Sequence, residues 1–307
     1  MTRTAARLPD FVVVGAAKAG TTALHHYLGQ HPAIFVPQRQ EPSFFAFAGD
    51  SPRFRGPGGS QASINRTAVT GLTEYGHLYK RARQCQVLGD VSPVYLYWPS
   101  TAGTLRQCVP RIRIIVILRH PVDRAFSAYM HAQREGKEPI ADFREALAAE
   151  PERIAQDWGF LWRYAALGDY LPQLRRYFDR FSSEQIKVVL YEDLQDDPVA
   201  LCRQLQAFVG VDASLAPDVS VRYNVSGVPR SRGVHRLLRP GGVLGRSARR
   251  AAPLIGKERL QRWGIQLQTH NLERRRLDSA VRSALLPRFC SQVAELGQLI
   301  GRDLSHW

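Results

Sequence analysis

The residues best suited to chemistry lie near the start of the chain, in the segment VVVGAAKAGTTAL. An apolar run ends in a turn with Gly15, Lys18 and Gly20, and a helix-compatible stretch then begins with Thr21 and Thr22. Small residues let the backbone curl so that successive N–H groups converge on an anion, and a helix start adds partial positive charge. The segment therefore predicts a phosphate-binding loop between a strand and a helix.

Two other interpretations of this loop stay open. One is a plain strand-to-helix turn that happens to contain glycine. The other is the loop of a nucleotide kinase, which reads GxxxxGK[ST]. Here Thr21 follows Gly20 directly and the lysine lies inside the loop at Lys18, so the lysine placement of that motif is missing.

A second candidate anion site lies in RIIVILRHPVDRAFSAYMH. Arg119 ends the most apolar strand of the chain, and Ser127 follows eight residues later in a helical segment. In open α/β sheets ligands bind outside the carboxyl ends of the strands, where both candidate sites would lie. The alternative for Arg119 is capping of the next helix through a carboxylate, and we expect Arg124 to form a structural salt bridge.

A candidate base lies in QEPSFF, where Glu41 precedes Phe44 and Phe45. A carboxylate beside apolar walls can have a raised pKa and can accept a proton from a hydroxyl. The alternative is a solvated glutamate at the turn before Pro42. The histidines of the first helical region are interpreted as surface or packing residues, namely His25, His26 and His31.

These motifs together resemble those of sulfotransferases that use 3′-phosphoadenosine 5′-phosphosulfate (PAPS). GAAKAGTT is similar to their 5′-phosphosulfate loop, GxxKxGTT, and LRHPVDRAFSAY is similar to their 3′-phosphate motif, LRxPxxRxxSxY. EPSFF is similar to the segment that carries the base in carbohydrate, heparan-type and related bacterial members. The resemblance runs from about residue 11 to the end of the chain, but only the first two motifs are highly specific.

The resemblance implies a set of site residues. Lys18 and Glu41 would be catalytic, Glu41 as general base. The residues expected to bind the nucleotide are Ala17, Lys18, Ala19, Gly20, Thr21, Thr22, Arg119, Ser127 and, in a closing loop, Arg230. The residues expected on the acceptor side are Phe44, Phe45, Ser92 and Tyr95. In GDVSPVYL, Asp90 stands where the family usually has Glu, and Val91 stands where heparan-type enzymes have Lys.

The elements that would position these residues alternate between strands and helices. Apolar runs at 11–15, 34–37, 87–90, 111–119 and 186–194 read as strands with helical segments between them, and 270–300 reads as helical. This alternation predicts an α/β fold with a mostly parallel sheet covered on both faces. The resemblance implies its P-loop-like, three-layer form. We expect residues 1–307 to form a single domain in which 224–256, rich in Gly, Pro and Arg, is a mobile loop or lid.

Composition narrows the class of protein. The net charge of +15 suits anionic ligands, but neither an aromatic RNA platform nor a recognition helix is present, so we expect no nucleic-acid partner. The four scattered cysteines predict no metal site or disulfide framework. No signal peptide or membrane-length apolar run is found, so we expect a cytoplasmic bacterial protein without an integral membrane segment. The oligomeric state stays open.

The sequence thus predicts transfer of a sulfuryl group from PAPS to a hydroxyl by in-line displacement, without metal, giving 3′,5′-ADP and a sulfate ester. The expected acceptor is a carbohydrate or another small-molecule or lipid alcohol. Two alternatives remain: a P-loop-type nucleotide kinase, and a non-catalytic protein that binds nucleotides or nucleic acid.

Overall fold

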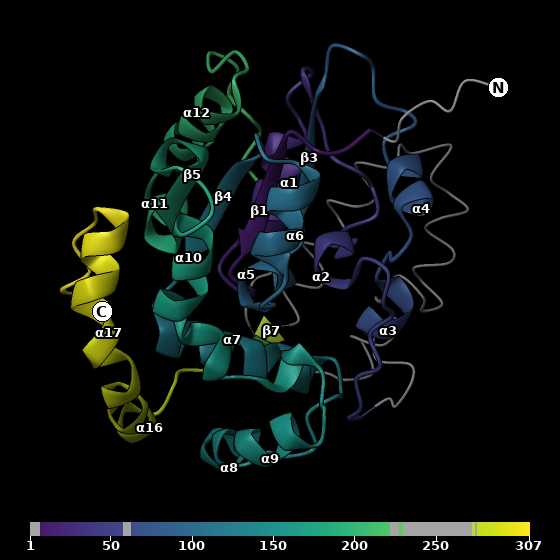
Figure 1. Cartoon of the computed structure of the whole chain (residues 1–307). Coiled ribbons are helices and arrows are strands. Elements are labelled where there is room, and N and C mark those ends of the chain that lie inside the picture. Colours follow the sequence, from purple (N-terminus) through teal and green to yellow (C-terminus); the bar gives the residue numbers. More distant parts are fainter. Residues whose placement is uncertain (1–6, 58–62, 222–226, 230–271, 274) are drawn as a thin grey trace, which may run out of the picture.

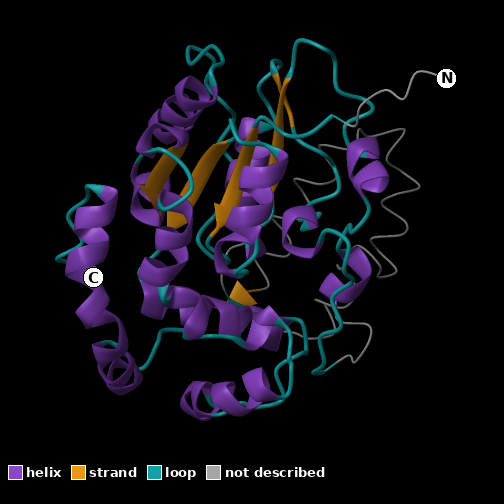
Figure 2. Ribbon diagram, viewed as in Figure 1, coloured by secondary structure: helices purple, strands orange, loops and turns teal. Residues whose placement is uncertain are grey.

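The structure is a computed structural model that describes residues 7–57, 63–221, 227–229, 272–273 and 275–307. Its centre is a parallel sheet of five strands in the order β2-β3-β1-β4-β5. The strands are β1 (Phe11–Gly15), β2 (Ile34–Phe35), β3 (Val87–Val91), β4 (Arg113–Leu118) and β5 (Ile186–Leu190). Figure 2 shows this sheet enclosed by helices. The predicted α/β fold with a mostly parallel central sheet is confirmed.

Helices cover both faces of the sheet (Figure 1). Helix α1 (Thr21–Leu28) packs against α12 (Pro198–Val209). Helix α1 contacts β3, and α12 contacts β4. Helix α5 (Val94–Tyr97) contacts β1 and also packs against α6 (Thr101–Cys108) and α10 (Tyr170–Phe178). The sheet therefore forms the middle of three layers, as sheets with strands buried on both faces require.

Further elements surround these layers. The remaining described helices are α2 (Phe44–Phe47), α3 (Ser63–Thr67), α4 (Leu72–His77), α7 (Pro121–Arg134), α8 (Phe143–Ala148), α9 (Glu150–Ala155), α11 (Tyr191–Asp196), α16 (Ser279–Leu285) and α17 (Pro287–Ile300). Short 3₁₀ turns are η2 (Phe160–Trp162), η3 (Ala166–Gly168) and η4 (Ser183–Gln185). Strands β6 (Val228–Pro229) and β7 (Leu272–Glu273) pair antiparallel, and β6 contacts α7. No helix among the described residues is long and apolar enough to cross a bilayer.

The core explains why β1 and β4 lie at the centre. Val12, Val13 and Val14 of β1 are fully buried, and so are the apolar side chains of β4 from Ile114 to Leu118. β-Branched residues suit strands that are covered on both faces. The register pairs Val12 with Asp90 on one side and with Ile114 on the other. As a result the carboxyl ends of β1, β3 and β4 lie at one edge of the sheet.

Two expected elements differ from the structure. The strand predicted over 186–194 ends at Leu190, because Asp193 accepts a hydrogen bond from the Leu190 N–H at 2.8 Å and α11 begins there. The helical segment predicted over 270–300 begins instead with β7, and Pro287 at the start of α17 separates α17 from α16. Of the predicted lid at 224–256, only 227–229 fall within the described residues.

Candidate active site

The turn after β1 has the geometry of an anion-binding loop. Gly20 has a φ of +104°, in the left-handed region, and a Cβ placed there would lie 2.6 Å from Leu194 Cδ2. Lys18 also has a positive φ, 69°, which is rare for a residue with a side chain. Helix α1 then begins at Thr21, so its first N–H groups face the turn. The turn predicted to bind phosphate is therefore a curled backbone at a helix start.

A cavity of about 410 Å³ lies at the carboxyl edge of the sheet and brings the predicted catalytic residues together. Its wall includes Lys18 and Glu41 together with Arg119 and Ser127, which are about a hundred positions away in the sequence. From the loop it also includes Ala17, Gly20, Thr21 and Thr22. Ala19 is fully buried in the core and takes no part in the cavity wall.

A second cavity, of about 870 Å³, adjoins the first. The two share Gly20, Arg119, Ser127 and Tyr191 in their walls, so they meet between the loop and α7. The second cavity adds Arg275, Arg276 and Arg282, and apolar or aromatic groups including Tyr27, Phe126 and Met130. Both cavities thus have cationic groups in their walls, and the second also has the carboxylates of Asp123, Glu192 and Asp196.

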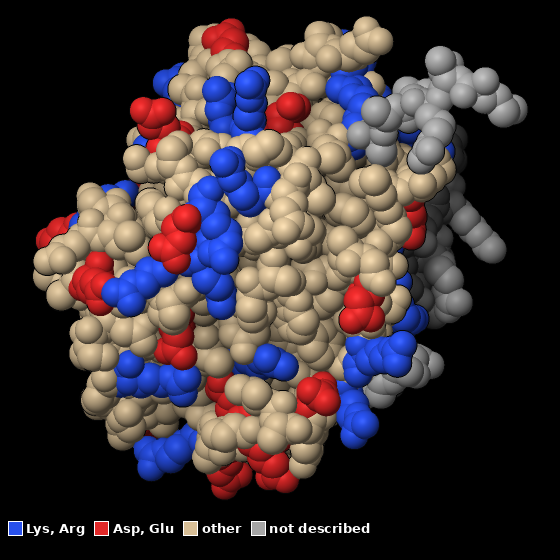
Figure 3. All heavy atoms as spheres, viewed as in Figure 1, with Lys and Arg blue, Asp and Glu red and all other residues tan. Residues whose placement is uncertain are grey.

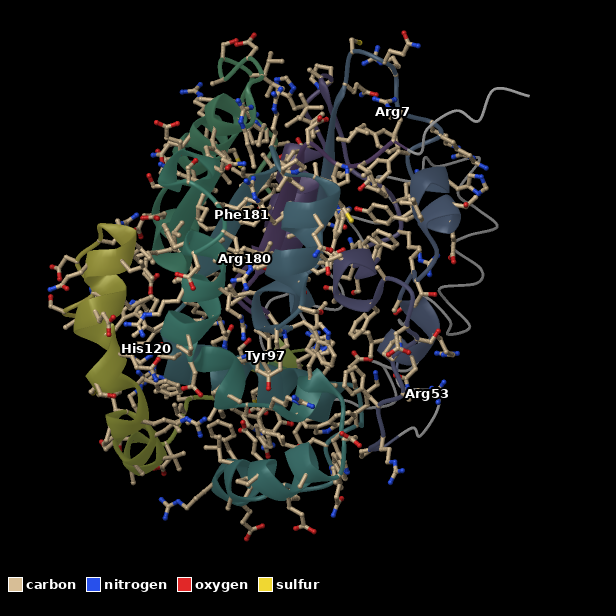
Figure 4. The ribbon with its side chains drawn as sticks, in the orientation of Figure 1. Arg7, Arg53, Tyr97, His120, Arg180 and Phe181 are labelled. Carbon is tan, nitrogen blue, oxygen red and sulfur yellow. The ribbon has the colours of Figure 1, made fainter. Side chains whose placement is uncertain are left out.

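Backbone contacts hold Arg119 beside the loop. Its guanidinium donates from Nη1 to the Lys18 carbonyl at 3.3 Å and lies 4.7 Å from the centroid of the Tyr191 ring. The Arg119 carbonyl accepts a hydrogen bond from the Tyr170 hydroxyl at 2.8 Å. The next residue, His120, labelled in Figure 4, caps α7 by accepting from the Val122 N–H at 3.2 Å. These contacts physically couple the two predicted anion sites.

Lys18 has an unusual electrostatic environment. Burial, and next the positive charge of Arg134, lower its pKa from 10.5 to about 8. Arg119 lowers this pKa further, whereas the carboxylates of Glu41 and Glu135 raise it. Because desolvation disfavours the charged form of a lysine, an anion bound in the cavity would stabilise protonated Lys18. Lys18 is therefore suited to neutralise negative charge next to the loop.

Glu41 lies across the cavity with the features of a base. It lines the cavity and is open to it, yet the surrounding protein desolvates its carboxylate and raises its pKa above the ordinary 4.5. The charge of Lys18 lowers the same pKa and that of Asp90 raises it. Its φ of 53° is strained for a non-glycine residue, and such strain is concentrated at functional sites. The structure thus places a base candidate close to a cation candidate.

The contacts of Arg124 differ from the expectation that it forms a structural salt bridge. Its side chain is fully buried, and among the described residues it forms no salt bridge. Its guanidinium donates to the Tyr164 carbonyl, while its Nε has no partner in the described structure. Burial lowers its pKa, and Arg124 lines the first cavity beside Ser127. A buried cation without a carboxylate is costly, so this residue favours an anion in the cavity.

The four residues predicted on the acceptor side lie behind the cavity wall. Phe44 and Phe45 are buried in the core, where Phe44 stacks on Tyr75 with ring centroids 4.3 Å apart. Ser92 and Tyr95 are fully buried and donate hydrogen bonds to Asp90. None of the four belongs to the described cavity wall, so the geometry favours a supporting role for them over direct acceptor contact.

Other predicted groups are outside the cavity or outside the described residues. Arg230 falls in the part of the chain that is not described. His25 is buried and its pKa is lowered to about 4 by burial and then by His26, so it stays neutral. His31 contacts the Asp212 carbonyl at 2.9 Å. Within the described ranges no cluster of His, Cys, Asp or Glu could hold a metal ion.

Sequence reasoning missed several residues of the two cavities. Arg275 and Arg276 reach the second cavity from the far end of the chain, where the basic run RRR was the available signal. Tyr191 was hidden in a segment predicted to be strand. Phe160, Leu161 and Trp162 of η2 line the first cavity, and no motif marked them.

Comparisons with known proteins agree with this arrangement. The model of the Sulfotransferase family matches residues 9–214. The chain is 27% identical over 227 residues to the Bos taurus bifunctional heparan sulfate N-deacetylase/N-sulfotransferase 2, covering 72% of this chain and 24% of that protein. It is 26% identical over 255 residues to the Mus musculus heparan sulfate glucosamine 3-O-sulfotransferase 3A1, covering 83% and 59%. The chain thus spans between about a quarter and three fifths of these relatives.

A solved structure is similar over nearly the whole chain. The sulfotransferase from Alicyclobacillus acidocaldarius is 34% identical, with a TM-score of 0.75, and the match covers 98% of this chain and 99% of that one. The family model covers the phosphate loop, the Glu41 segment and the Arg119–Ser127 segment together. The chain belongs to the sulfotransferase family.

Proposed function

We propose that this protein transfers a sulfuryl group from PAPS to a hydroxyl of an acceptor, leaving 3′,5′-ADP and a sulfate ester. The observation that carries the proposal is the shared wall of the two cavities. Lys18 lines the first cavity, Arg119 and Ser127 line both, and the Arg119 guanidinium donates to the Lys18 carbonyl at 3.3 Å. The two negatively charged ends of a nucleotide with a 3′-phosphate and a 5′-phosphosulfate match these two groups of donors and cations.

The residues present fit such a nucleotide. The left-handed φ of Gly20 lets the turn curl tightly against Leu194, and the start of α1 offers N–H groups for the 5′-phosphosulfate. Arg119 and Ser127 offer donors for the 3′-phosphate side, with Arg275 and Arg276 at the second cavity. The apolar and aromatic groups of the second cavity would cover the adenosine.

The chemistry then needs positioning and charge stabilisation more than a covalent intermediate. The acceptor oxygen attacks sulfur in line with the bond to the 5′-phosphate oxygen. A new S–O bond forms, the bond to the bridging oxygen breaks, and the hydroxyl proton moves to the Glu41 carboxylate. Lys18 neutralises the charge that builds on the departing oxygen. We propose that no metal takes part, as the sequence predicts.

The wall around Glu41 supports a small alcohol as acceptor. Pro57, Ile64, Phe160, Leu161 and Trp162 give it apolar and aromatic surface, and Lys137 adds one cation. Sugars and flat apolar alcohols both pack on such surfaces. The relatives named above act, by their names, on heparan sulfate, which supports a carbohydrate, while the apolar wall also suits another small-molecule or lipid alcohol. Cytoplasmic location and the absence of a nucleic-acid partner remain predictions from the sequence.

The proposal is tested by binding and by transfer. In calorimetry, 3′,5′-ADP should bind at least about tenfold more tightly than 5′-ADP or ATP, because charge-assisted hydrogen bonds to the second phosphate are worth about 1.5–3 kcal/mol. A preference for ATP would favour the kinase alternative, and a preference for an oligonucleotide would favour a nucleic-acid-binding protein.

Replacement of Lys18 tests the assignment of the cation. With radiolabelled PAPS and a panel of glycosides, phenols and apolar alcohols, Lys18→Ala should lower transfer by at least about a hundredfold, as loss of a transition-state charge partner does. Lys80→Ala, at an exposed position, is the matched control and should behave as wild type. Substantial transfer by Lys18→Ala would refute the role of Lys18.

A further inference from the structure

The carboxylate of Asp90 is fully buried at the end of β3, and among the described residues it forms no salt bridge. Three hydroxyls donate to it instead. Ser92 Oγ donates to Oδ1 at 2.8 Å, and the hydroxyls of Tyr95 and Tyr75 donate to Oδ2 at 2.7 Å each. Burying a charge without a cation is costly. Asp90 is therefore a feature for which the fold alone gives no reason.

Two of these three hydroxyls also accept hydrogen bonds from the segment that carries Glu41. Ser92 Oγ accepts a hydrogen bond from the Ser43 N–H at 3.0 Å, and the Tyr95 hydroxyl accepts from the Phe45 N–H at 3.3 Å. A hydroxyl has a single hydrogen. Because both hydrogens point to Asp90, the oxygen lone pairs of Ser92 and Tyr95 must face the segment. Asp90 thus accepts the one hydrogen of each hydroxyl, while the hydroxyl oxygens accept from the Ser43 and Phe45 N–H groups.

The segment held in this way is strained. Glu41 and Ser43 have φ values of 53° and 58°, which residues with side chains adopt only where their surroundings fix them. Ser43 precedes α2 but its own side chain does not cap that helix and donates instead to the Glu41 carbonyl at 3.1 Å. The Ser43 and Phe45 N–H groups are therefore satisfied by Ser92 and Tyr95.

We propose that Asp90 is a positioning residue for the base, acting through Ser92 and Tyr95 to hold the Glu41 segment so that the Glu41 carboxylate lines the cavity near Lys18. The role rests on the proposed sulfuryl transfer, in which Glu41 accepts the proton. Asp90, Ser92 and Tyr95 are fully buried and are not part of the wall of either cavity, so they would act by supporting the Glu41 segment.

Asp90 also acts on Glu41 electrostatically. The charged groups that influence the Glu41 pKa are Lys18 from the β1–α1 loop, which lowers it, and Asp90 from β3, which raises it. His26 of α1 contacts Gln40, the neighbour of Glu41, at 3.2 Å, and burial lowers its pKa. Burial raises the pKa of Asp90 itself, and the hydrogen bonds from Tyr95, Tyr75 and Ser92 lower it. In the pH range where Asp90 is ionised, its replacement by Asn should therefore lower the Glu41 pKa and make Glu41 a weaker base.

The structure provides a matched pair of variants. Tyr95→Phe and Tyr75→Phe each remove one 2.7 Å hydrogen bond to Asp90 Oδ2 from a fully buried ring. Both rings pack against Phe45, but only the Tyr95 hydroxyl also accepts a hydrogen bond from the Glu41 segment. The readout is turnover of radiolabelled PAPS with water as the acceptor, in which water takes the sulfuryl group to give sulfate and 3′,5′-ADP. Thermal unfolding and binding of 3′,5′-ADP are measured alongside.

Tyr95→Phe and Ser92→Ala should lower turnover by about ten- to a hundredfold, as small misplacements of a catalytic group do. Tyr75→Phe should lose similar thermal stability but keep turnover within about twofold of wild type, and all three variants should bind 3′,5′-ADP normally. Asp90→Asn should slow turnover as well and should move the acid limb of its pH profile to lower pH. A role in stability alone would leave that limb unmoved.

Equal turnover in Tyr95→Phe and Tyr75→Phe, or an Asp90→Asn variant with the wild-type acid limb, would overturn the positioning role. If Asp90→Asn does not fold, the tyrosine pair and Ser92→Ala still decide it. A wild-type protein that neither binds 3′,5′-ADP nor consumes PAPS would instead overturn the proposed function, and the role of Asp90 with it.

Discussion

At the scale of single residues, the candidate site pairs the ammonium group of Lys18 with the carboxylate of Glu41 in the wall of one cavity. Burial lowers the Lys18 pKa and raises the Glu41 pKa, so the two pKa values lie closer together than those of free side chains. Each charge opposes part of the other's shift, because Glu41 raises the Lys18 pKa and Lys18 lowers the Glu41 pKa. The charge of each group therefore favours the ionised form of the other, which is the state that the proposed transfer requires.

This pair predicts a bell-shaped pH profile. Glu41 must be deprotonated, so kcat/KM should fall on the acid side through a pKa above 4.5. Lys18 must be protonated, so kcat/KM should also fall as the pH rises through about 8. Steady-state kinetics across this range check both limbs.

Lys18→Arg is the control for the alkaline limb. An arginine stays protonated throughout, so this variant should be slower but should lose the limb near pH 8. An unchanged alkaline limb in Lys18→Arg would mean that another group titrates there.

At the scale of elements, the junction between β1 and α1 depends on backbone shape. Gly20→Ala should destabilise the protein by about 1–3 kcal/mol, because its left-handed φ is strained for alanine and the new Cβ would lie 2.6 Å from Leu194 Cδ2. Thermal or urea unfolding measures the change. Binding of 3′,5′-ADP should weaken too, since the turn has to open to admit the methyl group.

A second glycine serves as the matched control for this prediction. Gly103 lies within α6, and a Cβ there would have no atom within 4 Å. Gly103→Ala should therefore stabilise the protein by about 0.5–1 kcal/mol through helix propensity. Equal effects of the two substitutions would show that the turn at Gly20 has no special geometry.

The elements also show how far the sequence alone could lead. Strands β1 and β4 were predictable because each is an apolar run that ends at a residue type suited to a turn or to an anion. The start of α11 was not, since it depends on Asp193, which Arg302 holds from the other end of the chain at 2.7 Å. Ser92 and Tyr95 matched a motif, but only the structure shows that they face Asp90.

At the scale of the whole molecule, the sheet brings the separate motifs to one edge. The loop after β1, the segment after β2 and the start of α7 all follow the carboxyl ends of strands of one parallel sheet, and α7 runs below the sheet in Figure 1. On the face seen in Figure 3, Lys and Arg side chains are interspersed with Asp and Glu. The positive charges that matter for the proposed function are those of the two cavities.

The central claim is that one nucleotide spans both cavities, and a crystal structure of the protein with 3′,5′-ADP tests it most directly. We expect the 5′-phosphate on the turn around Lys18 and Gly20, and the 3′-phosphate within hydrogen-bonding distance of Arg119 and Ser127. A nucleotide bound with its phosphates away from these residues would contradict the account.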